Sequence, residues 1–424
     1  MKVINILTHL PQEIIHRYKD PEEYIKEFPK TEFIKLSTEP YWIGFFKQDW
    51  HHHWGGYIKA ASPNIQMECW RPYGSVIDSV FSLNVEGVEH KVFPSKTSKI
   101  PKVGEFMSSP LMLEELKKER NNSECIVHFY GAHDSLINYL LINLKPVSCK
   151  IIIQQLGAWF GYYDIKSAKP YVKPFKYLLW KRELKALKYC NLFLTASKVE
   201  EEFIERTLNL KCKFFLNGIN FDIYRSKQTK SETRQLYKIN DDAKVILYIG
   251  RLNATKNANL LIQAFLKVKK RIPQAHLLLV GCYKNDEYYQ MAIDAGATVI
   301  LRNDSELDVF FNMSDLYVLP IKDKKIQDFG GFGIAPIEAL AYNIRVISPN
   351  IKHFNGTNSE REIIGSEIKD FDRLDELLAK EIQRKDIVSG QIRDIAKKYF
   401  DIIENSKEMV LIYQDLIAEN RYNA

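Results

Sequence analysis

The sequence predicts an α/β protein of two domains, each built on a mostly parallel sheet. Three observations lead to this prediction. The chain has 424 residues, and single hydrophobic cores stop growing at about 250–300 residues. Short β-branched or aromatic segments alternate with longer amphipathic segments over most of the length. Several of the short segments are apolar throughout, as is typical of strands that are covered on both faces.

Composition narrows the class of protein. Hydrophobic residues make up 46% of the chain and charged residues 27%, which is globular composition. The six cysteines stand singly without a C-x-x-C pair, which favours a reducing, cytoplasmic setting over a zinc or disulfide framework. No apolar run reaches the roughly 18 residues of a membrane helix, and the N-terminus predicts a short strand instead of a signal peptide. The net charge of +7 suits anionic ligands or an anionic membrane surface.

The strand and helix pattern is clearest in the second half. Leu260, Leu261, Ala264, Phe265 and Val268 share one face of a predicted helix. Strands are predicted on either side of this helix and beyond it, at residues 244–249, 276–280, 298–301, 316–319 and 344–347. Alternation of this kind indicates parallel strands joined by helical crossovers.

The first half has the same rhythm with less regularity. Residues 1–40 and 76–101 fit no clear pattern, and the polar segment 224–242 reads as a linker. We therefore predict an N-terminal domain (1–223), a C-terminal domain (224–398) and a terminal amphipathic segment (399–424). Further strands are predicted at residues 42–46, 67–70, 125–130, 150–154, 191–195 and 213–216.

Residues 250–256 are suited to bind a diphosphate. They follow an apolar strand and precede a helix, which is where open α/β sheets bind ligands. Gly250 permits close backbone approach, Arg251 presents a fork of donors to phosphate oxygens, and Lys256 adds a second cation. From the spacing alone, a solvated loop with ordinary surface charge explains these residues equally well.

A second glycine-rich segment immediately precedes a predicted helix. Unobstructed backbone N–H groups at the positive end of a helix bind anions. Glu338 lies inside that helix, where a carboxylate either accepts hydrogen bonds from ribose hydroxyls or is simply solvated. The donor-binding candidates of the segment are Asp328, Gly330, Gly331, Phe332, Gly333 and Ile334.

These segments together resemble glycosyltransferase family 4, the glycosyl transferases group 1, whose retaining enzymes have the GT-B fold. GRLNATKN is similar to the family's G-R-L-x-x-x-K-[GN]. The segment GGFGIAPIEALAYNIRVI resembles E-G-F-G-x-x-x-x-E-A-m-A-x-G-x-P-V-i. Residues 217–220 (NGIN) resemble N-G-[IV]-[DN], and residues 276–281 (HLLLVG) resemble the strand l-l-i-v-G. The elements occur in the family's order between about residue 125 and about residue 415.

The resemblance implies two Rossmann-like domains that face each other across a cleft, with a UDP- or GDP-type sugar donor held mainly by the second domain. It assigns Arg251 and Lys256 to the donor diphosphate and Glu338 to the ribose. It also implies sugar transfer with retention to a glycan or lipid-linked saccharide, without a metal or other cofactor, as in polysaccharide biosynthesis. Fixed cations and N–H donors would stabilise the charge that develops on the leaving diphosphate. The terminal segment would cross back to the N-terminal domain.

Two departures from the family pattern bear on activity. Gly330 stands where the family has an acidic residue that contacts the donor sugar, and Asp328 is the nearest substitute. The strand at residues 150–154 is followed by Gln155 instead of His-Gly. An alternative therefore stays open, namely a catalytically weakened GT-B subunit that binds nucleotide or glycan without turnover.

The acceptor side is less well marked. Residues 49–56 (DWHHHWGG) follow a predicted strand and precede a helical stretch, a position that resembles the family's glycine-rich acceptor-side loop. We expect Gly55 and Gly56 to act there. Further candidates are His53 in this segment and His128 and Gln155 near the ends of other strands. A single histidine more often has a structural role.

Residues 171–189 combine aromatic and basic side chains at helical spacing. Such a pattern fits either a peripheral contact with the inner face of a membrane or an amphipathic helix that covers the sheet. No basic stripe interleaved with stacking residues indicates a nucleic-acid partner. No strand opens into G-x-G-x-x-G, which argues against a nicotinamide oxidoreductase.

Overall fold

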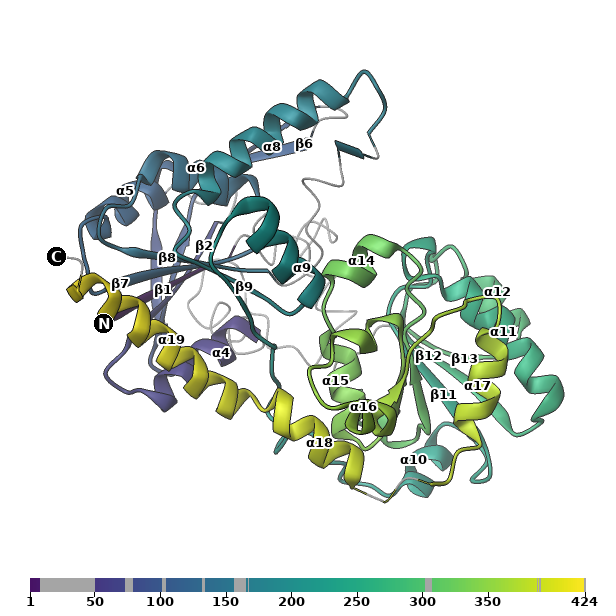
Figure 1. Cartoon of the computed structure of the whole chain (residues 1–424). Coiled ribbons are helices and arrows are strands. Elements are labelled where there is room, and N and C mark those ends of the chain that lie inside the picture. Colours follow the sequence, from purple (N-terminus) through teal and green to yellow (C-terminus); the bar gives the residue numbers. More distant parts are fainter. Residues whose placement is uncertain are drawn as a thin grey trace. The chain divides into compact units, whose positions relative to one another are not determined.

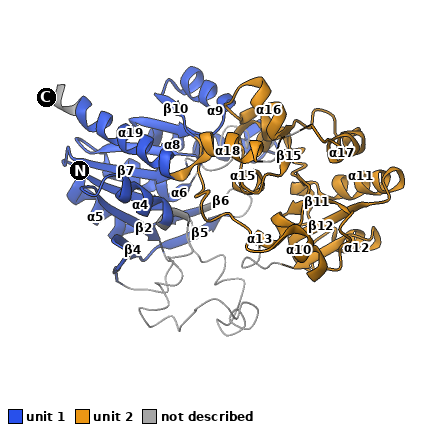
Figure 2. Cartoon of the chain, turned by 90° about the horizontal axis from the view of Figure 1, so that it is seen from below, with its two compact units in different colours: residues 1–215, 403–424 blue, residues 216–402 orange. Residues whose placement is uncertain are grey.

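The computed structural model describes residues 1–7, 50–72, 79–100, 104–131, 134–155, 165–166, 168–301, 307–386, 388 and 390–422. The chain forms two compact units (Figures 1 and 2). Unit 1 comprises residues 1–215 and 403–424, and unit 2 comprises residues 216–402. Each unit is an α/β structure on its own sheet, of eight strands in unit 1 and six in unit 2. The division falls at residue 216, eight residues before the predicted start of the second domain at residue 224.

The sheet of unit 1 has the order β10-β9-β8-β7-β1-β2-β4-β3. Its neighbours pair in parallel except β3 with β4. A separate antiparallel pair consists of β5 (Lys96–Ile100) and β6 (Gly104–Ser108). The strands of the main sheet are β1 (Lys2–Leu7), β2 (Gln66–Pro72), β3 (Phe81–Val85), β4 (Val88–Phe93), β7 (Cys125–Tyr130), β8 (Lys150–Gln154), β9 (Leu192–Thr195) and β10 (Cys212–Phe214).

Helices with an apolar face cover this sheet. Helix α6 illustrates why they form: Asp134 caps its first turn by accepting a hydrogen bond from the Leu136 N–H (2.7 Å). The buried residues of α6 recur at helical spacing and join the core with β7 and β8. The helices of the unit are α4 (Trp50–Ala61), α5 (Pro110–Glu119), α6 (Ser135–Leu144), α8 (Lys173–Leu187), α9 (Lys198–Phe203) and α19 (Ile402–Tyr422).

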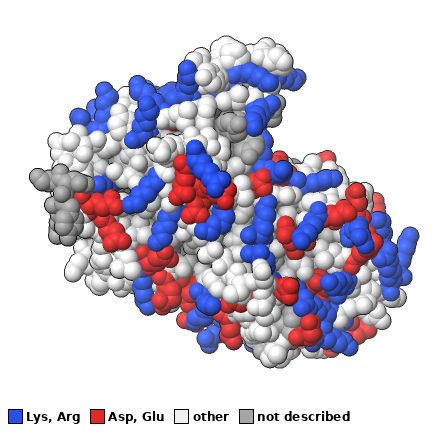
Figure 3. Space-filling model, viewed as in Figure 1, with Lys and Arg blue, Asp and Glu red and all other residues white. Residues whose placement is uncertain are grey.

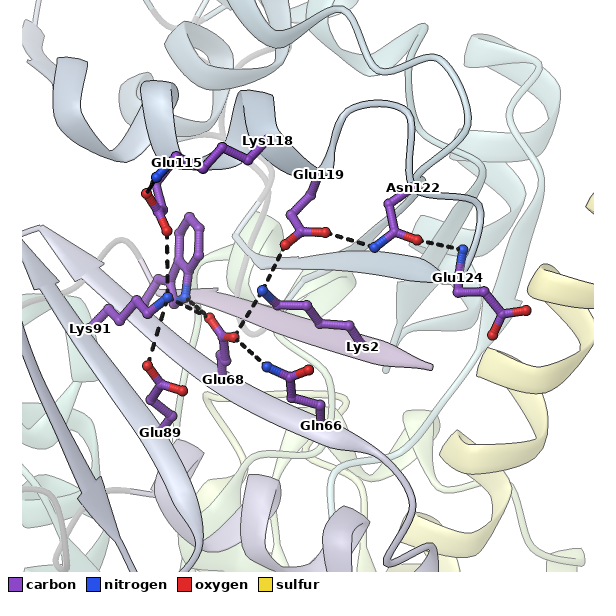
Figure 4. A network of polar contacts seen from close by, with 11 residues as sticks. Lys2, Gln66, Glu68, Glu89, Lys91, Glu115, Lys118, Glu119, Asn122 and Glu124 are labelled. Atoms are coloured by element: carbon purple, nitrogen blue, oxygen red, sulfur yellow. Dashed lines mark hydrogen bonds and ion pairs between the residues drawn. The ribbon is translucent and has the colours of Figure 1, made fainter.

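A network of charged side chains joins three strands of unit 1 to α5 (Figure 4). Its centre is Glu68 on β2, whose side chain is only 1% exposed. Glu68 pairs with Lys2 (2.9 Å) and Lys91 (3.2 Å), and it accepts a hydrogen bond from the Trp70 indole N–H (2.8 Å). Lys2 also reaches Glu119 on α5 (2.7 Å). Two cations and an N–H donor together compensate the desolvation of this buried carboxylate.

The sheet of unit 2 is entirely parallel, in the order β13-β12-β11-β14-β15-β16. Numbered within the unit, this order is 3-2-1-4-5-6, that of a Rossmann fold. The strand order reverses between β11 and β14, so ligands are expected outside the carboxyl ends of these two strands. The strands are β11 (Lys244–Ile249), β12 (Ala275–Cys282), β13 (Thr298–Leu301), β14 (Leu316–Val318), β15 (Arg345–Ile347) and β16 (Gly365–Ser366).

Helices lie on both faces of this sheet, as Figure 1 shows. Because side chains alternate along a strand, Val245 and Leu247 of β11 enter one core cluster, and Ile246 and Tyr248 enter the other. The longer segments are α10 (Lys230–Leu236), α11 (Ala258–Arg271), α12 (Tyr289–Asp294), α13 (Leu307–Asn312), α14 (Lys324–Phe329), α15 (Ile334–Ala341), α16 (Asn358–Ile364), α17 (Leu374–Ile382) and α18 (Gln391–Phe400). Two 3₁₀ turns, η2 (Ala254–Lys256) and η4 (Pro349–His353), belong to the loops described below.

Candidate donor site

The first predicted phosphate segment begins at the carboxyl end of β11, beside the reversal of strand order. Gly250 has φ +147°, a conformation that favours glycine, and its N–H donates to the Val280 carbonyl (2.8 Å). A Cβ atom at this position would lie 3.2 Å from the Tyr248 hydroxyl oxygen. That hydroxyl donates to the Arg251 carbonyl (2.7 Å). The turn that carries Arg251 is thereby held at the end of the strand.

Arg251 is oriented by an aspartate that the sequence analysis did not single out. Its Nε lies 2.5 Å from Oδ1 of Asp286, and its guanidinium carbon lies 4.5 Å from the centre of the Tyr283 ring. The Asp286 side chain is fully buried and also accepts hydrogen bonds from the backbone N–H groups of Leu252 (3.0 Å) and Tyr283 (2.9 Å). Because Asp286 takes the Nε edge, both terminal nitrogens of Arg251 are left without a hydrogen bond in the described part of the chain.

Lys256 is the second cation of the segment and ends the turn η2. Asn253 caps this turn by accepting a hydrogen bond from the Lys256 N–H (3.1 Å). The Lys256 side chain is half-buried, and burial lowers the pKa of its ammonium group. Among the described residues no carboxylate lies within ion-pairing distance of it. A partly desolvated cation without a counter-charge is stabilised when an anion binds.

The second predicted phosphate segment is a turn between α14 and α15. Gly331 and Gly333 have φ of +62° and +87°, so the turn depends on glycine at both positions. Gly333 is the N-cap of α15 and offers no side chain to the first helical turn. The backbone N–H groups of residues 331–335 donate to no protein atom that the structure describes. They form a set of donors at the positive end of a helix, which is suited to a phosphate.

The two apolar residues of this segment contribute backbone only. The Phe332 side chain is 2% exposed and stacks on Phe400, with 5.2 Å between ring centres. Ile334 packs against the same core cluster. Gly330 ends α14, and its N–H donates to the Ile326 carbonyl (2.9 Å).

The two predicted carboxylates of the site have protein partners. Glu338 on α15 accepts a hydrogen bond from the Tyr224 hydroxyl (2.9 Å), and burial raises the pKa of its carboxyl group. Asp328 on α14 pairs with Lys352 of η4 (2.7 Å). Tyr224 and Lys352 were not predicted, because each lies far along the chain from its partner. No spacing in the sequence connects them.

The glycine pair predicted to form an acceptor-side loop in unit 1 lies inside helix α4, so the predicted loop conformation is wrong. Helix α4 already begins at Trp50. Trp54 and Ile58 are fully buried on one face of α4. Gly55 lets this face approach the sheet, because a Cβ atom there would lie 3.3 Å from Cγ of Met67. Packing of the apolar face thus overrides the low helix propensity of glycine. His53, the remaining candidate of this segment, is exposed on α4.

The other acceptor-side candidates are buried in unit 1. His128 is fully buried within β7; its Nδ1 lies 2.8 Å from the Tyr413 hydroxyl of α19, and its ring stacks on Tyr130. The expectation that His128 faces a ligand is therefore corrected to a structural contact between the sheet and α19. Gln155 is 7% exposed, and its N–H donates to the Leu194 carbonyl (2.9 Å). The side chains of His51 and His52 lie outside the described residues.

Comparison with known proteins identifies the second unit. Residues 229–394, nearly the whole of unit 2, match the family glycosyl transferases group 1. Unit 2 therefore matches a group 1 glycosyltransferase domain. The matched residues include Arg251 and Lys256 on the loop after β11 and Glu338 on α15.

Two curated relatives support the assignment. An uncharacterized glycosyltransferase of Methanocaldococcus jannaschii is 26% identical over 335 residues, which cover 72% of this chain and 79% of the relative. The capsular polysaccharide biosynthesis glycosyltransferase CapM of Staphylococcus aureus is 25% identical over 267 residues, or 59% of this chain and 67% of CapM.

Solved structures show that the chain has the GT-B fold. Sucrose-phosphate synthase from Thermosynechococcus elongatus superposes with a TM-score of 0.63 at 15% identity, covering 99% of both chains. HepE from Anabaena, solved in complex with UDP, superposes with a TM-score of 0.61 at 12% identity over 98% of this chain and 100% of HepE.

Among the described residues, no group of three or more His, Cys, Asp or Glu is arranged to hold a metal ion. None of the helices in the described ranges is long and apolar enough to span a bilayer.

Proposed function

We propose that this chain is a group 1 glycosyltransferase that transfers a sugar from a nucleoside-diphosphate sugar to a glycan or lipid-linked saccharide, with retention of configuration and without a metal. The observation that carries the proposal is the state of Lys256. Its ammonium group is half-buried without an anionic partner among the described residues, five positions after an arginine whose outer nitrogens are also unoccupied. Two such cations beside the carboxyl end of β11 suit a diphosphate.

The proposed reaction breaks the bond between the anomeric carbon and the donor phosphate oxygen. The acceptor hydroxyl oxygen forms the new bond to that carbon, and its proton passes to the leaving phosphate oxygen. Negative charge therefore grows on the diphosphate. Arg251, Lys256 and the free N–H groups of residues 331–335 supply donors for this charge, and loss of one such donor typically costs about 10²–10³ in rate. Glu338, with Tyr224 beside it, would accept hydrogen bonds from the ribose.

We propose a uridine nucleotide as the first donor to test and polysaccharide biosynthesis as the process. HepE and a trehalose-6-phosphate protein from E. coli were solved with UDP and UDP-2-fluoro glucose respectively, and CapM is named for capsular polysaccharide biosynthesis. A GDP-linked donor is the alternative, and the test below includes it.

The test is a thermal-shift panel of UDP, GDP and their sugars with wild-type protein, Arg251→Ala and Lys256→Met. A ligand at 100 times its dissociation constant stabilises by about 2.7 kcal/mol. In a domain of this size that stabilisation raises the unfolding midpoint by several degrees, at roughly 2–4 °C per kcal/mol. We expect one nucleotide series to shift the wild type and not the two variants. Lys270→Met, which removes an exposed lysine of α11, is the matched control and should shift like wild type.

Either of two results would contradict the proposal. One is no shift with any nucleotide; the other is an equal shift in wild type and in both variants. Turnover separates the enzyme from the alternative of a weakened binding subunit. An active enzyme slowly hydrolyses its donor in the absence of acceptor, whereas a subunit that only binds shows nucleotide-dependent shifts and no hydrolysis.

We further propose that α8 docks this enzyme on an anionic membrane surface. Large apolar side chains are exposed near its start: Tyr171 (58%), Phe175 (55%), Tyr177 (49%) and Leu178 (62%). The one acidic residue of the helix, Glu183, is 3% exposed, so the exposed charges of α8 are all basic, and blue surface without red marks the helix in Figure 3. Exposed apolar groups with flanking cations suit the interface of an anionic bilayer.

Vesicle pelleting tests this docking surface. We expect wild type to pellet with vesicles that contain phosphatidylglycerol and not with pure phosphatidylcholine. The double variant Lys181→Glu/Lys185→Glu should stay in the supernatant. The matched control reverses two exposed lysines of unit 2, Lys270→Glu/Lys284→Glu, and should pellet like wild type. If both double variants lose vesicle binding equally, the binding depends on net charge alone. If neither variant loses vesicle binding, the proposed docking surface is wrong.

A further inference from the structure

We infer that Asn350 is a positioning residue that aims the glycine turn between α14 and α15 at the donor diphosphate. This inference rests on the proposed function, because it assumes that the turn binds phosphate. Asn350 belongs to η4, which follows β15, and neither its residue type nor its spacing marked it in the sequence. It is 3% exposed.

The contacts of Asn350 define its orientation. Its Nδ2 lies 2.5 Å from the Gly331 carbonyl oxygen and 3.3 Å from the Ile326 carbonyl oxygen. Because both neighbours are acceptors, the amide nitrogen and not the amide oxygen must face them. The Asn350 backbone is held in turn by the Ser348 hydroxyl, which accepts a hydrogen bond from its N–H (3.1 Å). One buried side chain thus joins the last turn of α14 to the glycine turn that follows it.

The contact with Gly331 determines where the next N–H group points. In a trans peptide the carbonyl of one residue and the N–H of the next point in opposite directions. Holding the Gly331 carbonyl on Asn350 therefore turns the Phe332 N–H away from Asn350. That N–H is one of the group at residues 331–335 that donate to no described protein atom. Asn350 therefore satisfies the Gly331 carbonyl and leaves the Phe332 N–H available to a ligand.

Two neighbours on η4 hold the same segment. Lys352 pairs with Asp328 (2.7 Å), and Nε2 of His353 lies 2.5 Å from the Gln327 carbonyl oxygen. Burial lowers the pKa of His353 to about 4, so at neutral pH its imidazole is uncharged and donates through Nε2. Side chains from one short turn therefore contact residues 326, 327, 328 and 331.

This arrangement matters because the turn contains two glycines in conformations that favour glycine, Gly331 and Gly333. Glycine loses more conformational freedom on ordering than any other residue. If ligand binding had to order Gly331 and Gly333, the entropy loss would weaken affinity. A turn that is already held in the binding conformation avoids that loss. Asn350 is therefore expected to act on diphosphate affinity and on the rate of transfer without touching the donor.

The test compares Asn350→Ala and Asn350→Asp with wild type in the full chain. The probe is whichever nucleoside diphosphate the wild type binds best, UDP or GDP, and the phosphate-free probe is its nucleoside, measured by competition. We expect the dissociation constant of the diphosphate to rise about tenfold or more, while that of the nucleoside changes less than about threefold. Asn350→Asp keeps the shape and places a carboxylate against two carbonyl oxygens, so it should weaken diphosphate binding further and lower kcat.

The control is Asn312→Ala. Asn312 also donates from Nδ2 to a backbone carbonyl of unit 2, that of Gln228 (2.9 Å), and its loss measures the general effect of removing such a bond. It should leave both dissociation constants unchanged. If Asn350→Ala does not fold, the isosteric Asn350→Asp variant carries the test.

The outcomes separate the inference from the function on which it rests. Unchanged diphosphate affinity in the Asn350 variants overturns the positioning role alone. Parallel weakening of diphosphate and nucleoside, together with a lower unfolding midpoint, reduces Asn350 to a structural residue and also overturns it. A wild type that binds no nucleoside diphosphate overturns the proposed function, and the inference fails with it.

Discussion

At the scale of single residues, the candidate site consists of groups that the sequence marks and groups that hold them in place. Arg251 and Lys256 follow an apolar strand at recognisable spacing, so local pattern predicts them. Asp286, which orients Arg251, comes from the loop after the neighbouring strand β12. Its position after the carboxyl end of a strand was the one available signal. A single aspartate in a polar loop is too common to be selected on that signal.

The Asp286–Arg251 pair yields the first prediction. In Asp286→Asn, an amide replaces a carboxylate that accepts from Arg251, Leu252 and Tyr283, and its NH₂ group must face at least one donor. We expect nucleoside-diphosphate affinity, measured by calorimetry, to fall about tenfold, and the free energy of unfolding to fall by about 1–3 kcal/mol.

A second buried aspartate of unit 2 supplies the control. Asp375 pairs with Lys267 and Arg271 in contacts between α17 and α11. Asp375→Asn should lower the unfolding midpoint and leave nucleotide affinity unchanged. If the two variants lose affinity equally, the effect of Asp286 is a general loss of stability.

At the scale of elements, strands were predicted better than the segments between them. β7, β8, β11 and β13 have the predicted bounds, because each contains three to five consecutive apolar or β-branched residues. The predicted strand at residues 42–46 lies outside the described residues. The strands β3 to β6 were not predicted. In β5 every residue is exposed, so burial imposes no apolar pattern on it.

Helix α4 shows how packing decides an element that local propensity does not, and it yields the second prediction. Gly56 has no atom within 4 Å of an added Cβ, so Gly56→Ala should raise the free energy of unfolding by about 0.5–1 kcal/mol through helix propensity. Gly55 faces Met67, Cys69 and Val88, so Gly55→Leu should lower it by about 1–3 kcal/mol through overpacking.

Chemical denaturation of the two glycine variants, side by side, measures both signs. The pair serves as its own control, because the substitutions are adjacent in one helix. If Gly56→Ala lowers the free energy of unfolding, the backbone at residue 56 needs glycine, as in a loop with positive φ. In that case the helical assignment of this turn would be wrong.

At the scale of the whole molecule, contacts between distant parts of the chain complete each unit. Residues 403–424 cluster with unit 1 although they follow unit 2 in sequence. Within unit 1, Tyr413 of α19 is fully buried, and its hydroxyl meets Nδ1 of His128, 285 positions away along the chain. This contact also explains why His128 was misread as an acceptor-side candidate. A histidine in a strand looks the same in sequence whether it faces a ligand or a helix.

The third prediction concerns this contact. Tyr413→Phe keeps the ring and removes the hydroxyl, which takes a hydrogen-bond partner from a buried imidazole. We expect the free energy of unfolding to fall by about 1–3 kcal/mol, measured by urea denaturation, with an unchanged denaturant slope. Tyr177→Phe, which removes an exposed hydroxyl from α8 of the same unit, should have no measurable effect. A neutral result for Tyr413→Phe would mean that the hydroxyl does not stabilise the attachment of α19.

The sequence by itself determined most of the parallel strands of both sheets. It also determined two glycine-containing segments, one that ends at Lys256 and one that precedes α15. Both are local features: a buried strand needs a run of apolar residues, and close backbone approach needs glycine. Tertiary structure alone decided that Asp286 orients Arg251, that Asn350 holds Gly331, and that Gly55 lies in a helix packed on β2 and β4. These contacts join residues that are separate in the chain. Their energy depends on burial and on donor–acceptor geometry, which no spacing in the sequence records.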